Sequence, residues 1–228
     1  MSKTLYLECY SGISGDMTVA ALLDLGADRE VLKESLKSLP VGGFRTEITR
    51  VKKSGLDACD FSVILEQDNH DHDMEYLHGS EKSYTGHYEH SHEVNHEHHH
   101  GHTHSHEHPY EHRGMKEITE IIQKSEMTVR AKKMAMRVFD ILAQAESKAH
   151  GVPVEEVHFH EVGAVDSIVD IAAIAICMDN LDISNVIVPV LYEGTGFIRC
   201  QHGQIPVPVP AVTHIAAVSY THLTLPTN

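Results

Sequence analysis

Apolar residues recur along this chain with two different periods, which indicates that strands and helices alternate. Leu5, Leu7 and Cys9 alternate with polar residues, as in a strand with one buried face. Spacings of three and four predict helices, and Gly or Pro marks most of their ends. The predicted strands cover residues 4–9, 44–51, 56–66, 157–162, 183–191 and 197–200. The predicted helices cover residues 17–25, 28–39, 116–125, 128–150, 153–156, 166–181 and a last one from Pro210.

This order of elements predicts an α/β fold, or an α+β fold with a mixed sheet. We expect one domain with an interruption: a β-α-α-β-β portion at 1–67, an insertion at 68–114, and the helical and α/β remainder of the same domain at 115–218. The prolines from Pro206 to Pro210 exclude a central strand there, because proline lacks the N–H that a strand ladder needs.

The insertion is dominated by histidine. Between His70 and His112 lie 15 of the 21 histidines, nine acidic residues and a single base, Lys82. With so few aliphatic residues and no periodicity, this segment cannot bury enough surface to offset its conformational entropy, so we expect it to be disordered. Neutral imidazoles bind Ni²⁺, Cu²⁺, Zn²⁺ and Co²⁺, so the segment is a candidate metal-binding tract, although it also fits an inert low-complexity linker. Its densest run of candidate ligands is His98, His99, His100, His102, His104 and His106.

Charge and cysteine content narrow the class of protein. The 228 residues carry a formal charge of −15, which argues against a nucleic-acid partner, because phosphate binding needs clustered cations. No apolar run is long enough to span a bilayer, and the first residues lead into a strand rather than a signal peptide. The four cysteines form no C-x-x-C pair, as expected of reduced thiols in a cytoplasmic protein. The sequence leaves open whether the chain forms a homo-oligomer.

A second group of metal-ligand residues surrounds a predicted strand-to-helix turn. His158 and His160 share one face of the strand, and Asp166 and Asp170 share one face of the following helix. Gly163 permits the tight turn that would bring the two pairs together. We predict a metal site from these four residues, with Glu161 as a candidate catalytic carboxylate. In the alternative interpretation, Asp166 caps the helix and Asp170 pairs with a cation.

The loop after the first strand is a candidate anion site. Ser11, Gly12, Ser14 and Gly15 are small residues at the carboxyl end of a strand, where exposed backbone N–H groups can meet a phosphate. Asp16 stands at the predicted N-cap and would repel a bare phosphate, so a metal-bridged phosphate or a metal alone fits better. We treat Asp16 as a candidate catalytic carboxylate, whereas a simple capped turn remains the alternative.

Three ordered motifs together resemble one family. The run Leu5–Met17, the block from Val157 to Asp170, and the stretch from Gly194 through Gly203 to Pro210 are similar to the LarC nickel-insertion proteins. A variable His-rich insertion between the first two blocks is also a feature of that family. The resemblance covers about residues 3 to 217, and the tail at 219–228 is unmatched.

The resemblance implies a concrete chemistry. Members of this family insert Ni²⁺ into pyridinium-3,5-bisthiocarboxylic acid mononucleotide, which forms the nickel-pincer nucleotide cofactor of lactate racemase. It also implies a lyase-type nickel chelatase that depends on cytidine triphosphate (CTP) with Mg²⁺ or Mn²⁺, bound by a C-terminal half of the same protein. A lactate racemase type apo-enzyme would receive the product.

Two other functions stay open at this stage. The His-rich tract by itself suits a non-enzymatic nickel storage protein or metallochaperone. His158, His160 and Asp166 would also suit a metal-dependent hydrolase of phosphorylated small molecules.

Overall fold

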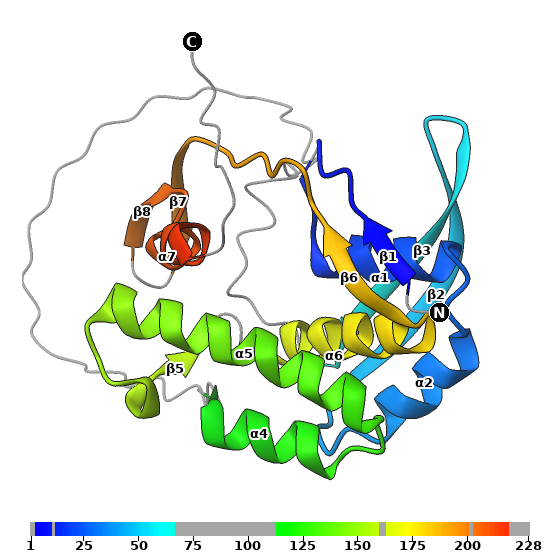
Figure 1. Cartoon of the computed structure of the whole chain (residues 1–228), viewed down its shortest axis with the longest axis horizontal. Coiled ribbons are helices and arrows are strands. Elements are labelled where there is room, and N and C mark those ends of the chain that lie inside the picture. Colours follow the sequence, from blue (N-terminus) through cyan, green and yellow to red (C-terminus); the bar gives the residue numbers. More distant parts are fainter. Residues whose placement is uncertain (1–2, 11, 67–112, 160–162, 201–202, 219–228) are drawn as a thin grey trace, which may run out of the picture.

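A computed structural model describes residues 3–10, 12–66, 113–159, 163–200 and 203–218 (Figure 1). The helices are α1 (Gly15–Asp24), α2 (Arg29–Lys37), α4 (Met115–Lys124), α5 (Val129–His150), the short 3₁₀ helix η1 (Val154–Glu156), α6 (Val165–Asn180) and α7 (Pro210–Val218). The strands are β1 (Lys3–Tyr6), β2 (Phe44–Lys53), β3 (Leu56–Leu65), β4 (Arg113–Gly114), β5 (His158–Phe159), β6 (Ile183–Ile187), β7 (Gly196–Cys200) and β8 (Gly203–Val207). The expected mixture of helices and strands is therefore confirmed.

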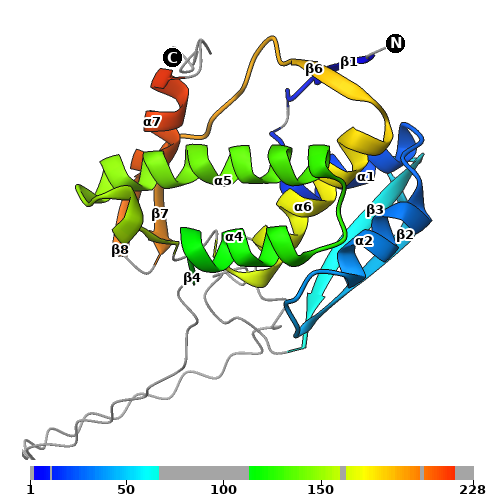
Figure 2. The same cartoon turned by 60° about the horizontal axis from the view of Figure 1, so that its bottom comes forward.

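Helix α6 lies at the centre of the molecule (Figure 2). It contacts α1, α2 and α5 as well as strands β3 and β6. Ile168, Val169, Ala172, Ala173 and Cys177 are all fully buried. A helix that is apolar on nearly every side must be covered on nearly every side, which explains why the other elements pack around this one.

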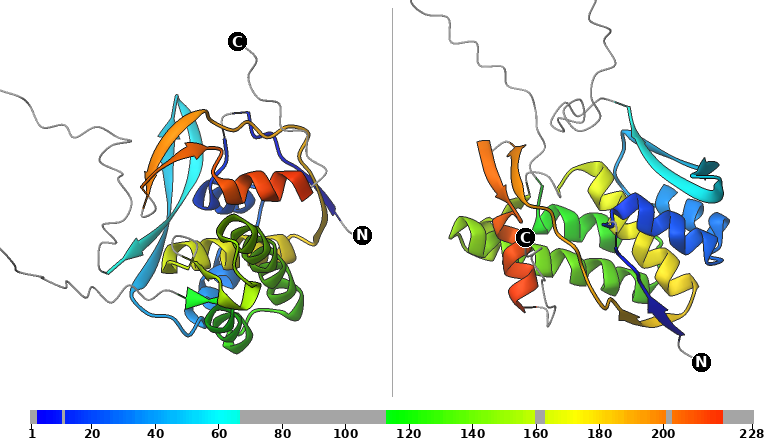
Figure 3. Two further views of the ribbon diagram at one scale, coloured as in Figure 1. Left: turned by 90° about the vertical axis from the view of Figure 1, so that its left-hand side faces the viewer. Right: turned by 90° about the horizontal axis from the view of Figure 1, so that it is seen from above.

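The strands pair in twos across the described ranges, instead of forming one mixed sheet. β1 and β6 are parallel, whereas β2–β3, β4–β5 and β7–β8 are antiparallel. The β2–β3 hairpin turns through Ser54 and Gly55, both with positive φ, as the Lys53-Ser54-Gly55 sequence suggests. The β7–β8 hairpin and α7 lie beside α5, far from β2–β3 (Figures 1 and 3).

Several predicted boundaries shift. β1 ends at Tyr6 rather than at Cys9, although Cys9 still forms an isolated parallel bridge with Leu191. β6 likewise ends at Ile187 rather than at Leu191. Strand β8 includes Pro206, which is tolerated because a two-stranded hairpin has no central strand. Pro210 opens α7 as predicted.

The helix ends also differ in detail. Ser14, not Asp16, is the N-cap of α1, since its hydroxyl accepts a hydrogen bond from the N–H of Met17. The N-cap of α6 is Ala164, so Asp166 lies inside the first turn and does not cap the helix. Gly151 ends α5 in the left-handed conformation, as its position in the sequence predicts.

The predicted insertion falls mostly outside the described residues, and so do Ser11, His160, Glu161 and the histidines from His98 to His106. Its last two predicted residues, Arg113 and Gly114, belong to the folded chain as β4. In the part of the chain that is described, no helix is long and apolar enough to cross a membrane. Cys9, Cys59 and Cys177 are free thiols.

Candidate metal-handling site

The first turn of α1 and the first two turns of α6 supply an acidic cluster formed by Asp16, Asp166 and Asp170. Gly15 marks the closest approach: a Cβ built on it would lie 2.3 Å from Oδ2 of Asp170 and 2.8 Å from its Cγ. Only glycine therefore lets the Asp170 carboxylate lie against the backbone of α1. Two segments that are far apart in the sequence thus supply one cluster.

Asp170 is in an unfavourable position for a charged group. The pKa of its carboxyl is raised to about 7, mainly by burial and then by the nearby charges of Asp16 and Asp166, while a hydrogen bond from the backbone N–H of Asp16 lowers it. Its Oδ1 is buried and has no hydrogen-bond partner among the described residues. A buried carboxylate oxygen without a donor, close to two other carboxylates, is a position where a cation would be stabilising.

The backbone N–H groups at the start of α1 are already occupied. The N–H of Asp16 is bound by Asp170, and the N–H of Met17 donates to Oδ1 of Asp16 at 2.8 Å. The Ser14 hydroxyl also donates to Oδ1 of Asp16. This helix start is therefore poorly suited to a bare phosphate, and the metal-bridged phosphate expected there stays a prediction.

The histidine side of the predicted site lies elsewhere. His158 is exposed, and its charge acts on Glu117, while Glu117 accepts a hydrogen bond from the N–H of Gly114 at 3.0 Å. The charges that act on Asp170 are those of Asp16 and Asp166. Across the described ranges, no group of three or more His, Cys, Asp or Glu side chains is arranged to hold a metal ion. The structure thus brings Asp16, Asp166 and Asp170 together but leaves His158 beside α4.

Gly163 fixes the turn between β5 and α6. A Cβ on Gly163 would lie 2.6 Å from the carbonyl oxygen of Phe159 and 3.3 Å from that of Arg113. Arg113 donates from Nη1 to the Gly163 carbonyl at 3.0 Å. This close packing explains why the motif needs glycine at that point and sets where α6 begins.

A pair of aromatic residues in the same region was missed in the sequence. Tyr10 and Tyr192 lie just beyond β1 and β6, with ring centroids 6.0 Å apart and an interplanar angle of 50°. Both are about half exposed. The signal was present: Tyr6, Glu8 and Tyr10 occupy the alternate positions to Leu5, Leu7 and Cys9, but only the apolar side was interpreted.

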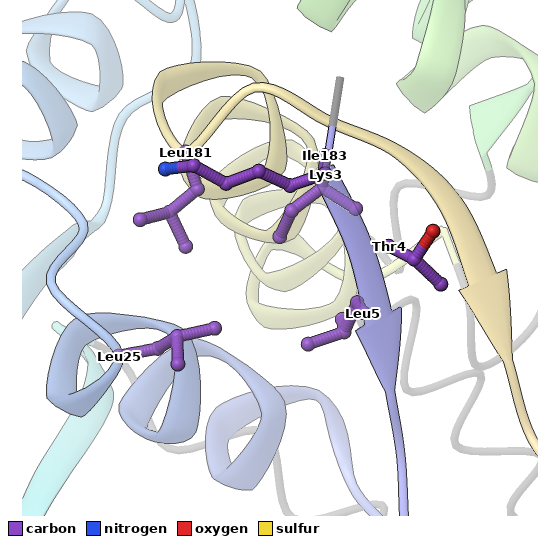
Figure 4. Close-up of a pocket in the computed structure, with 6 residues that line it drawn as sticks. All are labelled: Lys3, Thr4, Leu5, Leu25, Leu181 and Ile183. Atoms are coloured by element: carbon purple, nitrogen blue, oxygen red, sulfur yellow. The ribbon is translucent and has the colours of Figure 1, made fainter. Parts of the chain in front are cut away.

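A separate pocket of about 410 Å³ lies at the opposite ends of the two parallel strands (Figure 4). Its lining residues are Lys3, Thr4, Leu5, Leu25, Leu181 and Ile183. It contains one charged side chain and no carboxylate, so its chemistry is unlike that of the acidic cluster.

The raised pKa of Asp170 predicts how stability depends on pH in metal-free protein. Since the folded-state pKa of about 7 exceeds the usual 3.8, the folded state binds the proton more tightly. The free energy of unfolding should therefore fall as pH rises from about 4 to 7 and stay low above that range. Asp170→Asn should remove about 1–2 kcal/mol of this fall, after allowance for solvent screening at a partly exposed site. Urea denaturation of both proteins with chelator at pH 5, 6, 7 and 8 measures it, and parallel curves would contradict it.

The structure is a mixed helix-and-strand protein in which three aspartates from α1 and α6 lie close together. Comparison with known sequences then identifies the family: residues 5–227 match the model of the nickel insertion proteins, and the chain belongs to that family. The match extends into the segment 219–228, which the motifs alone had left unassigned.

Several curated relatives are similar over nearly the whole chain. The pyridinium-3,5-bisthiocarboxylic acid mononucleotide nickel insertion protein of Alkaliphilus metalliredigens is 53% identical over 94% of this chain and 46% of its own length. Its counterparts in Clostridium acetobutylicum and Geobacillus kaustophilus are 46% and 40% identical, over 93% of this chain and 49% and 44% of their own lengths. The chain thus spans about half the length of these relatives. No solved structure matches it.

Proposed function

We propose that this chain takes part in inserting nickel into pyridinium-3,5-bisthiocarboxylic acid mononucleotide, which makes the nickel-pincer nucleotide cofactor of lactate racemase. Family membership and the names of the relatives support this assignment. The relatives are about twice as long, which supports a further, C-terminal region of the same protein that completes the activity. In this proposal that region binds CTP with Mg²⁺ or Mn²⁺, as the family resemblance implies. The reaction is of the lyase type, and a lactate racemase type apo-enzyme receives the product.

The observation that supports the site assignment is the buried Oδ1 of Asp170, which has no hydrogen-bond partner in the part of the chain that the structure describes. Ni²⁺ near Asp16, Asp166 and Asp170 would offset both the missing hydrogen bond and the mutual repulsion of the carboxylates. His158, His160 and Glu161 come from the chain segment that leads into α6. We assign the two imidazoles to the same ion only during transfer, for which His158 would have to leave its place beside Glu117. A site that must release its ion is expected to be an incomplete coordination sphere, which keeps positions open for the substrate.

The transfer follows from ligand softness. Carboxylate oxygens and imidazole nitrogens hold Ni²⁺ less firmly than the two thiocarboxylate sulfurs of the substrate, so the ion moves toward sulfur. When the nickel–carbon bond forms, the ring carbon loses its hydrogen as a proton, which Asp16 or Glu161 accepts. The loop of Ser11, Gly12, Ser14 and Gly15 holds the substrate phosphate through the metal, since the first amides of α1 are already bound.

The His-rich tract acts in this proposal as a nickel reservoir and not as the insertion site. Deleting residues 70–112 should therefore leave single-turnover insertion within about twofold at saturating nickel, while most of the stoichiometric nickel binding disappears. The assay combines the chain, its C-terminal region, Ni²⁺, CTP, Mg²⁺ and the bisthiocarboxylate nucleotide, and follows the absorbance of the metallated product.

The outcome of this deletion separates the two main functions. If insertion disappears together with the histidines even at saturating nickel, the chain is a nickel storage protein or metallochaperone, as its histidine content alone would suggest. Phosphate release from nucleotides without any thiocarboxylated substrate would instead favour a hydrolase.

A further inference from the structure

One face of the β1–β6 pair is left uncovered by the residues that the structure describes. Leu5, Leu7 and Cys9 are buried or half-buried, and Leu5 packs against the hydrophobic core, whereas the alternating residues Tyr6, Glu8 and Tyr10 are exposed. Tyr6 pairs in register with Ile187, which is also exposed. Parallel strands are usually covered on both faces, so an exposed face of this kind is expected to have an occupant.

The carboxyl end of this face is both aromatic and acidic. Tyr10 and Tyr192 form the ring pair described above, and they follow the Cys9–Leu191 bridge. The charge of Glu8 is the largest of the influences that raise the pKa of Tyr10, with smaller effects from Tyr6 and Tyr192. Electron-rich tyrosine faces beside a carboxylate are suited to an aromatic ring that carries positive charge.

The position of the pair is also suitable for a small ligand. The carboxyl ends of parallel strands are where open α/β sheets bind ligands, because the loops that follow the strands are free to contact them. Here the loop after Tyr10 leads directly to Ser14 and to the acidic cluster at the start of α1. The same loop therefore connects a ring bound at Tyr10 to the candidate metal site at the start of α1.

We propose that Tyr10 and Tyr192 form a stacking site for the N-ribosylated pyridinium ring of the substrate, with Glu8 favouring the positively charged ring nitrogen. The inference rests on the proposed function for the identity of the ring, but it makes a separate claim about where the ring binds. It assigns the exposed face to a small aromatic cation and not to another protein.

Nicotinamide mononucleotide is a suitable probe, because it carries a pyridinium ring, a ribose and a phosphate. Its reduced form has the same size but an uncharged ring. Because the chain has no tryptophan, its tyrosine fluorescence can be followed, and quenching of that fluorescence reports binding. Calorimetry measures the same binding independently. We expect the oxidised probe to bind about fivefold more tightly than the reduced one.

Matched variants test the residues. Tyr10→Leu and Tyr192→Leu should each weaken binding of the oxidised probe about five- to twentyfold, whereas Tyr10→Phe and Tyr192→Phe should stay within about twofold. Phe197→Leu is the control, because Phe197 is an exposed aromatic residue on the β7–β8 hairpin (Figure 1) and is not part of the Tyr10–Tyr192 ring pair. The same series is then titrated with the bisthiocarboxylate nucleotide in the absence of nickel.

Three results would overturn the proposal: equal affinity for the two probes, unchanged affinity in both leucine variants, or no binding of either probe by the wild-type chain. Analytical sedimentation of the same proteins tests the alternative that a second copy of the chain binds this face. If Tyr10→Leu abolishes self-association but leaves probe binding intact, the face is a dimer interface and the proposal is wrong. Because these titrations contain no nickel, a failure here is distinct from a failure of wild-type nickel insertion.

Discussion

Asp170→Asn is expected to lower nickel transfer to the bisthiocarboxylate nucleotide by at least about 100-fold. Removing a group that merely supports a metal ligand costs roughly 10–100-fold, and loss of a ligand should cost no less. Asn keeps the size of the side chain and can still accept the hydrogen bond from the Asp16 N–H, but it removes the charge that holds the cation. The loss should therefore appear in metal handling while the fold is retained.

The measurement has two parts. Calorimetric titration with Ni²⁺ in a variant lacking residues 70–112 isolates the folded site from the His-rich tract, and the product assay then reports transfer. Asp140→Asn is the matched control, because it makes the same chemical change on α5, and Asp140 is not among the charges that act on Asp170. Equal nickel affinity and equal transfer in the two variants would remove Asp170 from the metal site.

Gly15→Ala is expected to lower the free energy of unfolding by about 1–3 kcal/mol. In an ordinary helix the same change would stabilise by up to about 1 kcal/mol, because alanine has the higher helix propensity. The opposite sign is expected here since the new Cβ would lie 2.3 Å from Oδ2 of Asp170 and 2.8 Å from its Cγ. The start of α1 and the second turn of α6 would have to move apart, which should also weaken nickel binding.

Two further variants make this result specific. Gly42→Ala should change stability by less than about 0.5 kcal/mol, because a Cβ at Gly42 meets nothing within 4 Å. Adding Asp170→Ala to Gly15→Ala removes the contacts of the new Cβ with Oδ2 and Cγ but leaves the Cβ of residue 170 at 2.8 Å, so the double-mutant cycle should show a favourable but partial coupling. If Gly15→Ala is as stable as the wild-type chain by urea denaturation, the close contact between α1 and α6 is not as described.

The local elements were largely predictable because they depend on local patterns. The hairpin of β2 and β3, the long helix α5 with Thr128 and Gly151 at its ends, and the opening of α7 at Pro210 follow from periodicity and from turn and cap residues. The N-cap of α1 was misplaced by two residues, because Ser14 and Asp16 are both good caps and only the backbone conformation selects Ser14.

The candidate site was predictable only in part. Spacing alone places Asp166 and Asp170 on one face of α6, but it carries no information that Asp16, from the other end of the chain, lies beside them. The same limit applies to Tyr10 and Tyr192, whose rings meet only because β1 and β6 run in parallel. His158 was expected in the same site, yet it lies beside Glu117.

The sequence by itself determined the order of the elements, the His-rich composition between His70 and His112, and the motifs that carry the family resemblance. Only the tertiary structure decided that the Asp170 carboxylate is buried away from solvent and that the rings of Tyr10 and Tyr192 lie together. Periodicity reports which face of an element is apolar, whereas the burial of Asp170 and its repulsion from Asp16 depend on how α1 packs against α6. Desolvation and charge proximity are properties of three-dimensional packing, and for that reason they could not be predicted from residue spacing.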